Sequence, residues 1–415
     1  MVATYDGIIV GAGVMGANTA LQLASAGLTR LLMLEKAPGV GFGSTGKSSA
    51  IFRQTYSHYE TCLMARESLQ IIRNWQDFTG LKSTRADFRN SGVVFLLSQE
   101  GRAVEEVLSI HRRAGVVSEV LDAQARARLM PDFSFCSAHL DLDADAHECQ
   151  EGLTAIYEPE GGFADPVGTT EDLLEVARGL GVELRFKARV TQVLQSGGRV
   201  SGVEVEQDGN LETVHAPLVI NCAGPWAMGL NELAGVPLAE RIVPIRAQKL
   251  AKRHPERLRA PLPVVNDLIN GINIRPDATG TQIFMSSFRE HHSHEEVPDP
   301  DHYNDWADAP FREEVLTLAH HRIPTFQARG EITSYAGLYT VNLEDNHPVI
   351  DETELQGFFI LCGFSGHGFK LSPVVGMLIA QKVLGQWGRG KTDVPLNFFD
   401  RNRDPLRSFW SGFFT

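Results

Sequence analysis

A glycine-rich segment near the N-terminus, GAGVMG at residues 11–16, restricts the fold more than any other feature of the chain. The apolar run YDGIIV precedes it, and a helical pattern that ends at Gly27 follows it. A second apolar run, RLLML, then ends in Glu35. Strand, glycine turn, helix, strand and acid within about 30 residues are typical of a dinucleotide-binding, Rossmann-like unit.

Each part of this segment suits a dinucleotide. Gly11 permits the tight turn, Gly13 lets the diphosphate approach the backbone, and Gly16 lets the helix pack on the strand. The helix N-terminus offers free N–H groups and a positive dipole end to the diphosphate. The carboxylate of Glu35 is suited to accept hydrogen bonds from ribose hydroxyls. The residues predicted to hold the nucleotide here are Gly11, Gly13, Val14, Met15, Gly16, Glu35 and Lys36.

The segment after Lys36 distinguishes FAD from NAD. A plain NAD domain would continue with further strands and helices, whereas this chain continues with a glycine–serine loop over residues 37–56. Such a loop can follow the far side of a diphosphate and reach a flavin. The sequence therefore favours FAD, and Gly43, Ser44 and Thr45 are predicted to contact it.

Composition and charge exclude several classes of function. The net charge of −13 argues against a nucleic-acid partner or an anionic membrane surface. No apolar run approaches the roughly 20 residues of a membrane-spanning helix. The five cysteines are scattered and include no CxxC pair, which is typical of free thiols in a reducing compartment rather than of disulfides or a zinc site. We therefore expect a cytoplasmic protein.

Two kinds of segment alternate along the rest of the chain. Residues 160–193 have the pattern of a loop, a helix and a strand, and a hairpin region follows. The strand LVINCAGPWA then runs into a second glycine turn. Residues 61–150 have a helical, amphipathic pattern, whereas residues 240–335 carry strand-like runs. Val190, Ala223 and Gly224 are therefore predicted to join the nucleotide site.

This alternation predicts an α/β (α+β) fold of two interleaved domains. An FAD-binding domain is expected over residues 1–60, 151–235 and 336–400, and a substrate domain over residues 61–150 and 236–335. Residues 401–415 form a C-terminal tail, whose apolar end is expected to fold back on the body.

Near the C-terminus, GFSGHGFKLSP at residues 363–373 places three glycines beside a histidine and a lysine. A helix is expected from about Ser372. So much backbone freedom at a helix start is suited to the close approach of an anionic or polar ligand.

Together these motifs resemble the D-amino-acid-oxidase-like FAD-dependent oxidoreductases, and within them the sarcosine oxidase and dimethylglycine dehydrogenase branch. The anchors in chain order are GAGVMG with Glu35, GSTGKSSAIFRQTY (43–56), NCAGPW (221–226), AGLYTVNLEDNHPVID (336–351) and GFSGHGFKLSP. The resemblance implies a Rossmann-like FAD domain interleaved with a substrate domain on a large, mostly antiparallel sheet. It also implies oxidation of the C–N bond of a small secondary, tertiary or N-methylated amino acid by hydride transfer to flavin N5, giving an imine that hydrolyses.

The resemblance further implies roles for individual residues. Arg53 and Lys370 match the residues that hold the substrate carboxylate over the flavin ring. By their positions alone, Tyr56 and Tyr339 are candidates for lining the substrate cavity, and His367 is a candidate either for that or for a structural hydrogen bond. The remaining predicted cofactor contacts are Gly337, Gly363, Gly366, His367, Gly368, Phe369 and Lys370.

The chain departs from the family pattern in two places. Relatives attach the flavin covalently through a cysteine, where this chain has Gly337, or through a histidine, where it has Gly46-Lys47-Ser48. We therefore expect non-covalent FAD. The oxidases also use a lysine to activate oxygen on a strand that corresponds here to TQIFMSS, which has none; Lys249 is the nearest candidate.

Several alternatives stay open at the level of sequence. The electron acceptor is either O2 or an electron-transfer partner, and an oligomer is compatible with the chain. A 2-hydroxy acid or glycerol phosphate donor is the alternative substrate, and a non-catalytic, flavin-binding assembly subunit is the alternative role. The cluster of His291, His292 and His294 lies in a polar loop that is expected to be solvated, so no metal site is predicted.

Overall fold

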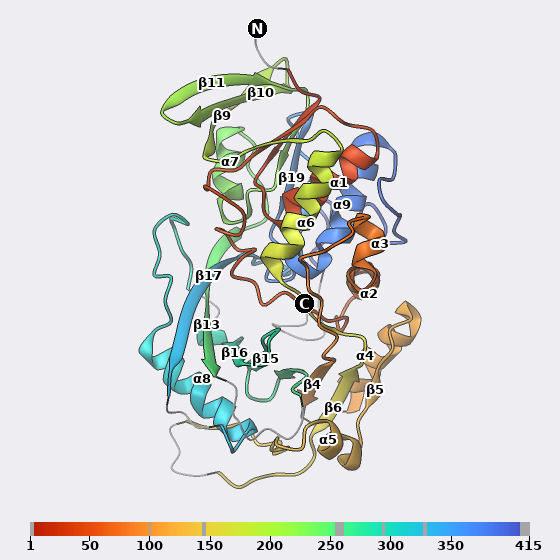
Figure 1. Cartoon of the computed structure of the whole chain (residues 1–415), viewed down its shortest axis with the longest axis vertical. Coiled ribbons are helices and arrows are strands. Elements are labelled where there is room, and N and C mark those ends of the chain that lie inside the picture. The colour runs from red at the N-terminus through yellow and green to blue at the C-terminus, as the bar shows by residue number, and fades with distance from the viewer. Residues whose placement is uncertain are drawn as a thin grey trace.

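The computed structural model describes residues 4–98, 101–142, 147–253, 261–292, 295–326 and 330–406. Two large sheets dominate this part of the chain, one above the other along the long axis of the molecule (Figure 1). The predicted fold class is confirmed: a parallel Rossmann-like sheet is combined with a larger, mostly antiparallel sheet. Among the described residues, no helix has the length and apolar character needed to cross a membrane.

The first sheet has six strands and carries the nucleotide-binding segment. Its strands are β18 (Val349–Glu352), β19 (Phe358–Cys362), β12 (Val219–Asn221), β1 (Gly7–Val10), β2 (Leu31–Leu34) and β8 (Glu183–Arg185), in that spatial order. All neighbours run parallel except β18 and β19. Consecutive residues of a strand point to opposite faces, so Ile8 and Ile9 enter different apolar cores.

Different elements cover the two faces of this sheet. The core that contains Ile9 includes apolar residues of α1 (Val14–Ser25), α2 (Tyr59–Arg73), α6 (Pro166–Gly179) and α9 (Gly368–Leu384). The core that contains Ile8 includes residues of β9 (Ala188–Ser196), β10 (Arg199–Gln207), β11 (Asn210–His215) and α7 (Ala227–Leu233). The side chain of Asp165 caps α6 by accepting from the N–H of Gly168 at 2.6 Å, as the Asp-Pro start predicts.

The second sheet has eight strands. In spatial order they are β17 (Ile332–Asn342), β13 (Ile242–Arg253), β16 (Gln282–Ser287), β15 (Ile272–Pro276), β14 (Val264–Asp267), β4 (Val93–Leu97), β6 (Thr154–Glu158) and β5 (Glu119–Val120). Only β14 and β4 pair in parallel within this sheet. Helix α8 (Ala309–Arg322) packs on one face through Phe311 and Val315, and α4 (Gly101–Ala114) contributes Val107 to the core on the other face.

The helical pattern expected over residues 61–150 is wrong at β4 and β5. Helices α2, α3 (Trp75–Thr79), α4 and α5 (Ala123–Leu129) do form there, but β4 is a fully buried strand between β14 and β6. A strand buried on both faces is a continuous apolar run without alternation, so it carries no period that separates it from a helix.

The domain ranges predicted from the sequence stay a prediction. β6, and the part of β17 that begins at residue 336, fall within the ranges given for the FAD-binding domain, and in the structure both belong to the eight-stranded sheet. A two-stranded ribbon of β3 (Ile51–Phe52) and β7 (Gly162–Phe163) leads from the nucleotide-binding loop to Arg53.

Candidate functional site: a dinucleotide cavity beside buried cations

The N-terminal glycine turn is shaped by two close backbone approaches. Gly11 has φ +103°, and a β-carbon there would lie 2.5 Å from the carbonyl oxygen of Cys222. A β-carbon on Gly16 would lie 2.0 Å from the carbonyl oxygen of Gly11. Any side chain at either position would therefore displace the turn. Thr45 also joins the turn, because its Oγ1 accepts from the N–H of Val14 at 3.1 Å.

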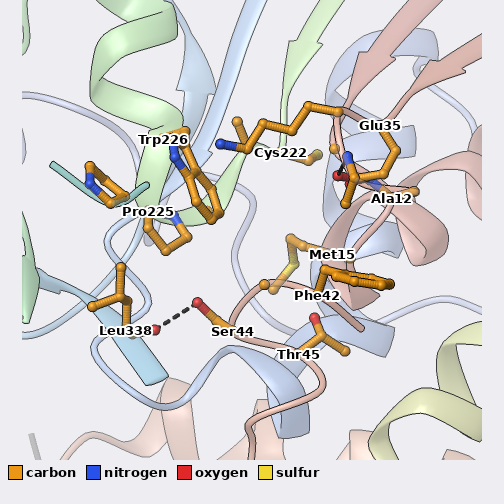
Figure 2. Close-up of a pocket in the computed structure, with 18 of the residues that line it drawn as sticks. Ala12, Met15, Glu35, Phe42, Ser44, Thr45, Cys222, Pro225, Trp226 and Leu338 are labelled. Atoms are coloured by element: carbon orange, nitrogen blue, oxygen red, sulfur yellow. Dashed lines mark hydrogen bonds between the residues drawn. The ribbon is translucent and has the colours of Figure 1, made fainter. Parts of the chain in front are cut away.

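Glu35 lies at the end of β2, opposite the turn. One carboxylate oxygen accepts from the N–H of Ala12 at 2.9 Å (Figure 2). The other accepts from the N–H of Ala37, also at 2.9 Å. These bonds fix the carboxylate at the wall of the cavity beside the turn. Its contact with a ribose stays a prediction.

A cavity of about 790 Å³ runs from this turn toward the second sheet. It is lined by most of the residues predicted to bind the cofactor: Gly11, Gly13, Val14, Met15, Glu35, Lys36, Gly43, Ser44, Thr45, Val190, Ala223, Gly224, Gly366, Gly368 and Phe369. The hydroxyl of Ser44 donates to the carbonyl oxygen of Leu338 at 2.6 Å and so joins the nucleotide-binding loop to β17 (Figure 2). Gly16, Gly337, Gly363, His367 and Lys370 are not among the residues that line the cavity.

The helix predicted from about Ser372 begins earlier, at Gly368, which corrects that prediction. Pro373 therefore lies inside α9, where it cannot donate a backbone N–H. The hydroxyl of Ser372 instead donates to the carbonyl oxygen of Phe369 at 2.9 Å, which satisfies the acceptor that Pro373 leaves open. Because Gly368 and Phe369 line the cavity, the first turn of α9 and its positive dipole end border the cavity.

Next to this helix start, four predicted residues come together from two distant segments. The guanidinium of Arg53 lies 4.3 Å from the ring centroid of Tyr56 and 3.5 Å from Nδ1 of His367. The Tyr56 hydroxyl also lies 3.3 Å from that Nδ1. Nζ of Lys370 donates to the carbonyl oxygen of Gly366 at 3.4 Å, and Gly366 lines the cavity. Tyr339 lines the cavity too, and its ring packs over Gly366.

The electrostatics of this group are positive. Burial, and then the charges of Lys370 and Arg53, hold the pKa of His367 well below its usual value, so the imidazole is neutral. Burial, and then the charges of Arg53 and Lys249, hold the pKa of Lys370 well below its usual value. Burial also raises the pKa of the Tyr56 hydroxyl to about 12, so this group stays protonated. An anion placed here would stabilise the charged forms of both Lys370 and Arg53.

The model of the DAO family, FAD dependent oxidoreductase, matches residues 6–382, which is most of the chain. The chain belongs to this family of FAD-dependent oxidoreductases. The predicted family is thereby confirmed, and so is FAD as the cofactor.

Relatives of this FAD-dependent oxidoreductase cover nearly its whole length. FAD-dependent oxidoreductase domain-containing protein 1 of Xenopus laevis is 29% identical over 98% of this chain and 83% of its own length. Monomeric sarcosine oxidase of Streptomyces avermitilis is 27% identical, with 97% of this chain and 98% of its own length covered. Human mitochondrial sarcosine dehydrogenase is 26% identical over 97% of this chain, which spans 41% of that protein. Among solved structures, L-proline dehydrogenase from P. horikoshii superposes with a TM-score of 0.79 at 22% identity, covering 96% of this chain and 97% of its own; this likeness shows the fold.

The cavity is also lined by residues that the sequence did not predict. Pro300, Asp301, Tyr303 and Asp305 belong to the polar loop between β16 and α8 and line the dinucleotide cavity. Asp301 accepts hydrogen bonds from Lys36 and, at 3.0 Å, from Nε1 of Trp226. Asp301 is 265 positions from Lys36 in the sequence, and no motif links the two, so only the three-dimensional structure could place the loop there.

Lys249 extends the buried positive charge onto the second sheet. It lies on β13 and donates from Nζ to the carbonyl oxygen of Lys47 at 2.6 Å. Burial, and then the charge of Arg275, lowers the pKa of Lys249 to about 7. Lys249 is close enough to Lys370 for its charge to contribute to the lowered pKa of Lys370.

Gly337 lies on β17, where a β-carbon would be 2.8 Å from Cβ of Lys47. Any larger residue there would push on the nucleotide-binding loop. The only cysteine among the described lining residues is Cys222, beside the N-terminal turn, and burial raises the pKa of its thiol to about 12.

The histidines at the start of the polar loop between β16 and α8, His291 and His292, are not among the residues that line the cavity. His291 and His292 lie near Glu314, and Arg289 already pairs with Glu314 at 2.6 Å. His294 and the apolar end of the tail, residues 409–415, lie outside the described residues.

Proposed function

We propose that the protein oxidises the C–N bond of a small, carboxylate-bearing amine, such as a secondary, tertiary or N-methylated amino acid. The observation that carries the proposal is the buried positive group of Arg53 and Lys370 beside the cavity. Arg53 is 2% exposed and Lys370 is 7% exposed. Buried cations gain most from an anionic ligand with hydrogen-bonding oxygens, and a carboxylate matches the fork of an arginine together with a lysine.

The residues present fit FAD, since the glycine turn and the cavity accept a dinucleotide that extends toward the cation group. When bound, FAD accepts the hydride equivalent that the substrate carbon gives up. Arg53 and Lys370 would bind the carboxylate and so orient the carbon that loses hydrogen. His367, neutral and close to Arg53 and Tyr56, would hold these side chains in place.

No described residue is needed as a dedicated base in this proposal. The substrate nitrogen reacts once it is unprotonated, and the positive surroundings of Lys370 and Arg53 favour the unprotonated amine over an ammonium. Orientation and electrostatics then supply most of the rate enhancement. We also propose that FAD is held without a covalent bond, which is supported by Gly337 and by the burial of the Cys222 thiol.

Relatives with known names support the amine class. One is a sarcosine oxidase, one a sarcosine dehydrogenase, and one, from Paenarthrobacter nicotinovorans, a 4-methylaminobutanoate oxidase that is 25% identical. The oxidant stays open between O2 and an electron-transfer partner.

The test is anaerobic reduction of the purified, flavin-containing protein. Sarcosine, other N-methylated amino acids, cyclic imino acids and a 2-hydroxy acid are added in turn while the flavin absorbance is followed. Bleaching by a secondary amino acid supports the proposal, and the rate of recolouring in air then separates oxidase from dehydrogenase. Bleaching only by the 2-hydroxy acid, or by none although dithionite still reduces the flavin, would refute it.

A further inference from the structure

A second cluster of reactive side chains contains no residue that lines the cavity. One ligand atom each of Cys136, His147 and His321 lies within 4.8 Å of the other two. The rings of His147 and His321 meet with their centroids 4.7 Å apart. The thiol of Cys149 lies next to this group, because it shares a hydrogen bond with the thiol of Cys136.

The surroundings of two members are those of metal ligands. The sulfur of Cys136, whose residue is 1% exposed, accepts hydrogen bonds from the backbone N–H groups of Ala138 and Gln150. Such bonds stabilise a thiolate. Nε2 of His321 is buried and has no hydrogen-bond partner among the described residues. A buried, unsatisfied ring nitrogen is costly unless something binds it.

The backbone behind the cluster is rigidly held. Arg322, which follows His321, is fully buried and binds Asp267 of β14 at 2.6 Å and 3.0 Å. The same guanidinium donates to the carbonyl oxygens of Ser134 and Cys136. The C-terminal end of α8 and the segment around Cys136 are thus fixed on one support, as the ligands of a structural metal must be.

We propose that Cys136, His147, Cys149 and His321 form a structural Zn²⁺ site. Two thiolates and two imidazoles are a ligand set that zinc takes in tetrahedral sites, with bonds of about 2.3 Å to sulfur and about 2.0 Å to nitrogen. Such a tetrahedron places its ligand atoms about 3.5 Å apart. Cys136, His147 and His321 therefore need to close inward by about 1 Å, and the thiol of Cys149, next to Cys136, would move into the fourth position. Each thiol gives its proton to solvent on binding, and the two thiolates neutralise the ion.

The group at His291, His292 and Glu314 is the weaker candidate for a metal. There the carboxylate of Glu314 already carries a cationic partner, Arg289, at 2.6 Å. In the cysteine–histidine cluster the neighbouring cation is Arg322, which binds Asp267 and backbone carbonyl oxygens. Arg322 therefore does not occupy the sulfur and ring-nitrogen atoms that would bind a metal.

The zinc site lies on the face of the large sheet opposite the cation group. On β13, Leu250 enters the core that α8 covers, whereas the neighbouring Lys249 reaches Lys47 beside the cavity. Adjacent residues of a strand point to opposite faces. We therefore expect the metal to stabilise the fold and not to take part in the redox chemistry.

The test uses the flavin-containing protein with its cysteine thiols reduced and any metal removed by a chelator. This protein is then titrated with Co²⁺. Tetrahedral Co²⁺ with thiolate ligands absorbs in the red, beyond the flavin. We expect one Co²⁺ per chain, displaced by Zn²⁺, and a higher melting temperature with Zn²⁺. Cys136→Ser and His321→Asn are each expected to weaken binding by more than about ten-fold, the lower bound seen when even an outer partner of a ligand is lost. His139→Asn, at an exposed histidine of the same segment, is the matched control and is expected to bind normally.

A second measurement does not depend on variants that fold. Cys149 is exposed, so it is expected to be alkylated quickly in the metal-free protein and to be protected by Zn²⁺. The proposal is overturned if the reduced protein with a normal flavin spectrum takes up no stoichiometric metal and Cys149 gains no protection. It is equally overturned if the Cys136→Ser and His321→Asn variants bind Co²⁺ as the wild type does, or if a Cys136–Cys149 disulfide forms and its reduced form binds no metal.

Discussion

Replacing Lys370 by methionine removes one of the two buried cations while nearly preserving the volume of the side chain. A hydrogen bond to a charged group contributes about 1.5–3 kcal/mol. At about 1.4 kcal/mol per factor of ten, its loss corresponds to a roughly 10- to 150-fold rise in KM for a carboxylated amine. Arg53 stays in place, so binding is weakened and not abolished.

The same substitution is expected to leave the free protein as stable as before, or more stable. Burial and the charges of Arg53 and Lys249 lower the pKa of Lys370 in the folded protein, whereas the unfolded chain has the ordinary value. The unfolded state therefore binds the proton more strongly, which destabilises the fold below the ordinary pKa of lysine. Methionine carries no such penalty.

Steady-state kinetics and thermal unfolding of the FAD-bound variant test both parts. Lys252→Met, at a buried lysine on β13 whose ammonium lies 5.5 Å from the ring of Phe326, is the control and should leave KM unchanged. An unchanged KM in Lys370→Met, or an equal rise for an amine without a carboxylate, would refute the assigned role. A large loss of stability would refute the electrostatic argument.

Three further predictions follow from the same geometry. Arg53→Lys should lower kcat/KM for a carboxylated amine by roughly ten-fold or more, because a lysine cannot offer the planar fork; equal kinetics would contradict this. Between pH 7 and 10.5 the unfolded chain keeps a proton on Lys249 that the folded chain has released. The free energy of unfolding should therefore rise with pH in this range, by up to about 1.4 kcal/mol per pH unit. Chemical denaturation should show this rise in the wild type and a smaller rise in Lys249→Met. Gly16→Ala should lose FAD, measured by absorbance after gel filtration, because its β-carbon meets the oxygen of Gly11 at 2.0 Å, whereas Gly179→Ala, at a position with open space, should keep it.

The sequence predicts the nucleotide half of the molecule well, because the information there is local. Gly11, Gly16 and Glu35 lie within one strand–turn–helix–strand unit, where spacing alone determines which residues meet. Arg53 and Lys370 are 317 positions apart, so the family resemblance, and not a sequence pattern, predicts that they act together. The structure places Arg53 next to His367 and Lys370 next to Gly366.

What the sequence could not predict depends on long-range packing. The loop with Asp301 lines the dinucleotide cavity because Lys36 and Trp226 bind it, and nothing in its composition distinguishes it from a solvated loop. The sequence predicts the start of α9 too late, because proline is usually found in the first turn of a helix. Here Pro373 lies inside the helix, and the hydroxyl of Ser372 compensates for its missing N–H. Cys136 and His147 meet His321 only through the folding of α8 onto the second sheet.

The central claim is that the buried cations select a substrate carboxylate beside the flavin. Its most direct test compares anaerobic flavin reduction by sarcosine, or whichever N-methylated amino acid reduces fastest, with reduction by the same amine lacking the carboxylate. We predict that the amino acid reduces the flavin at least roughly ten-fold faster at equal, subsaturating concentration, as expected for the loss of a charged hydrogen bond. Equal rates for the two compounds would contradict the claim.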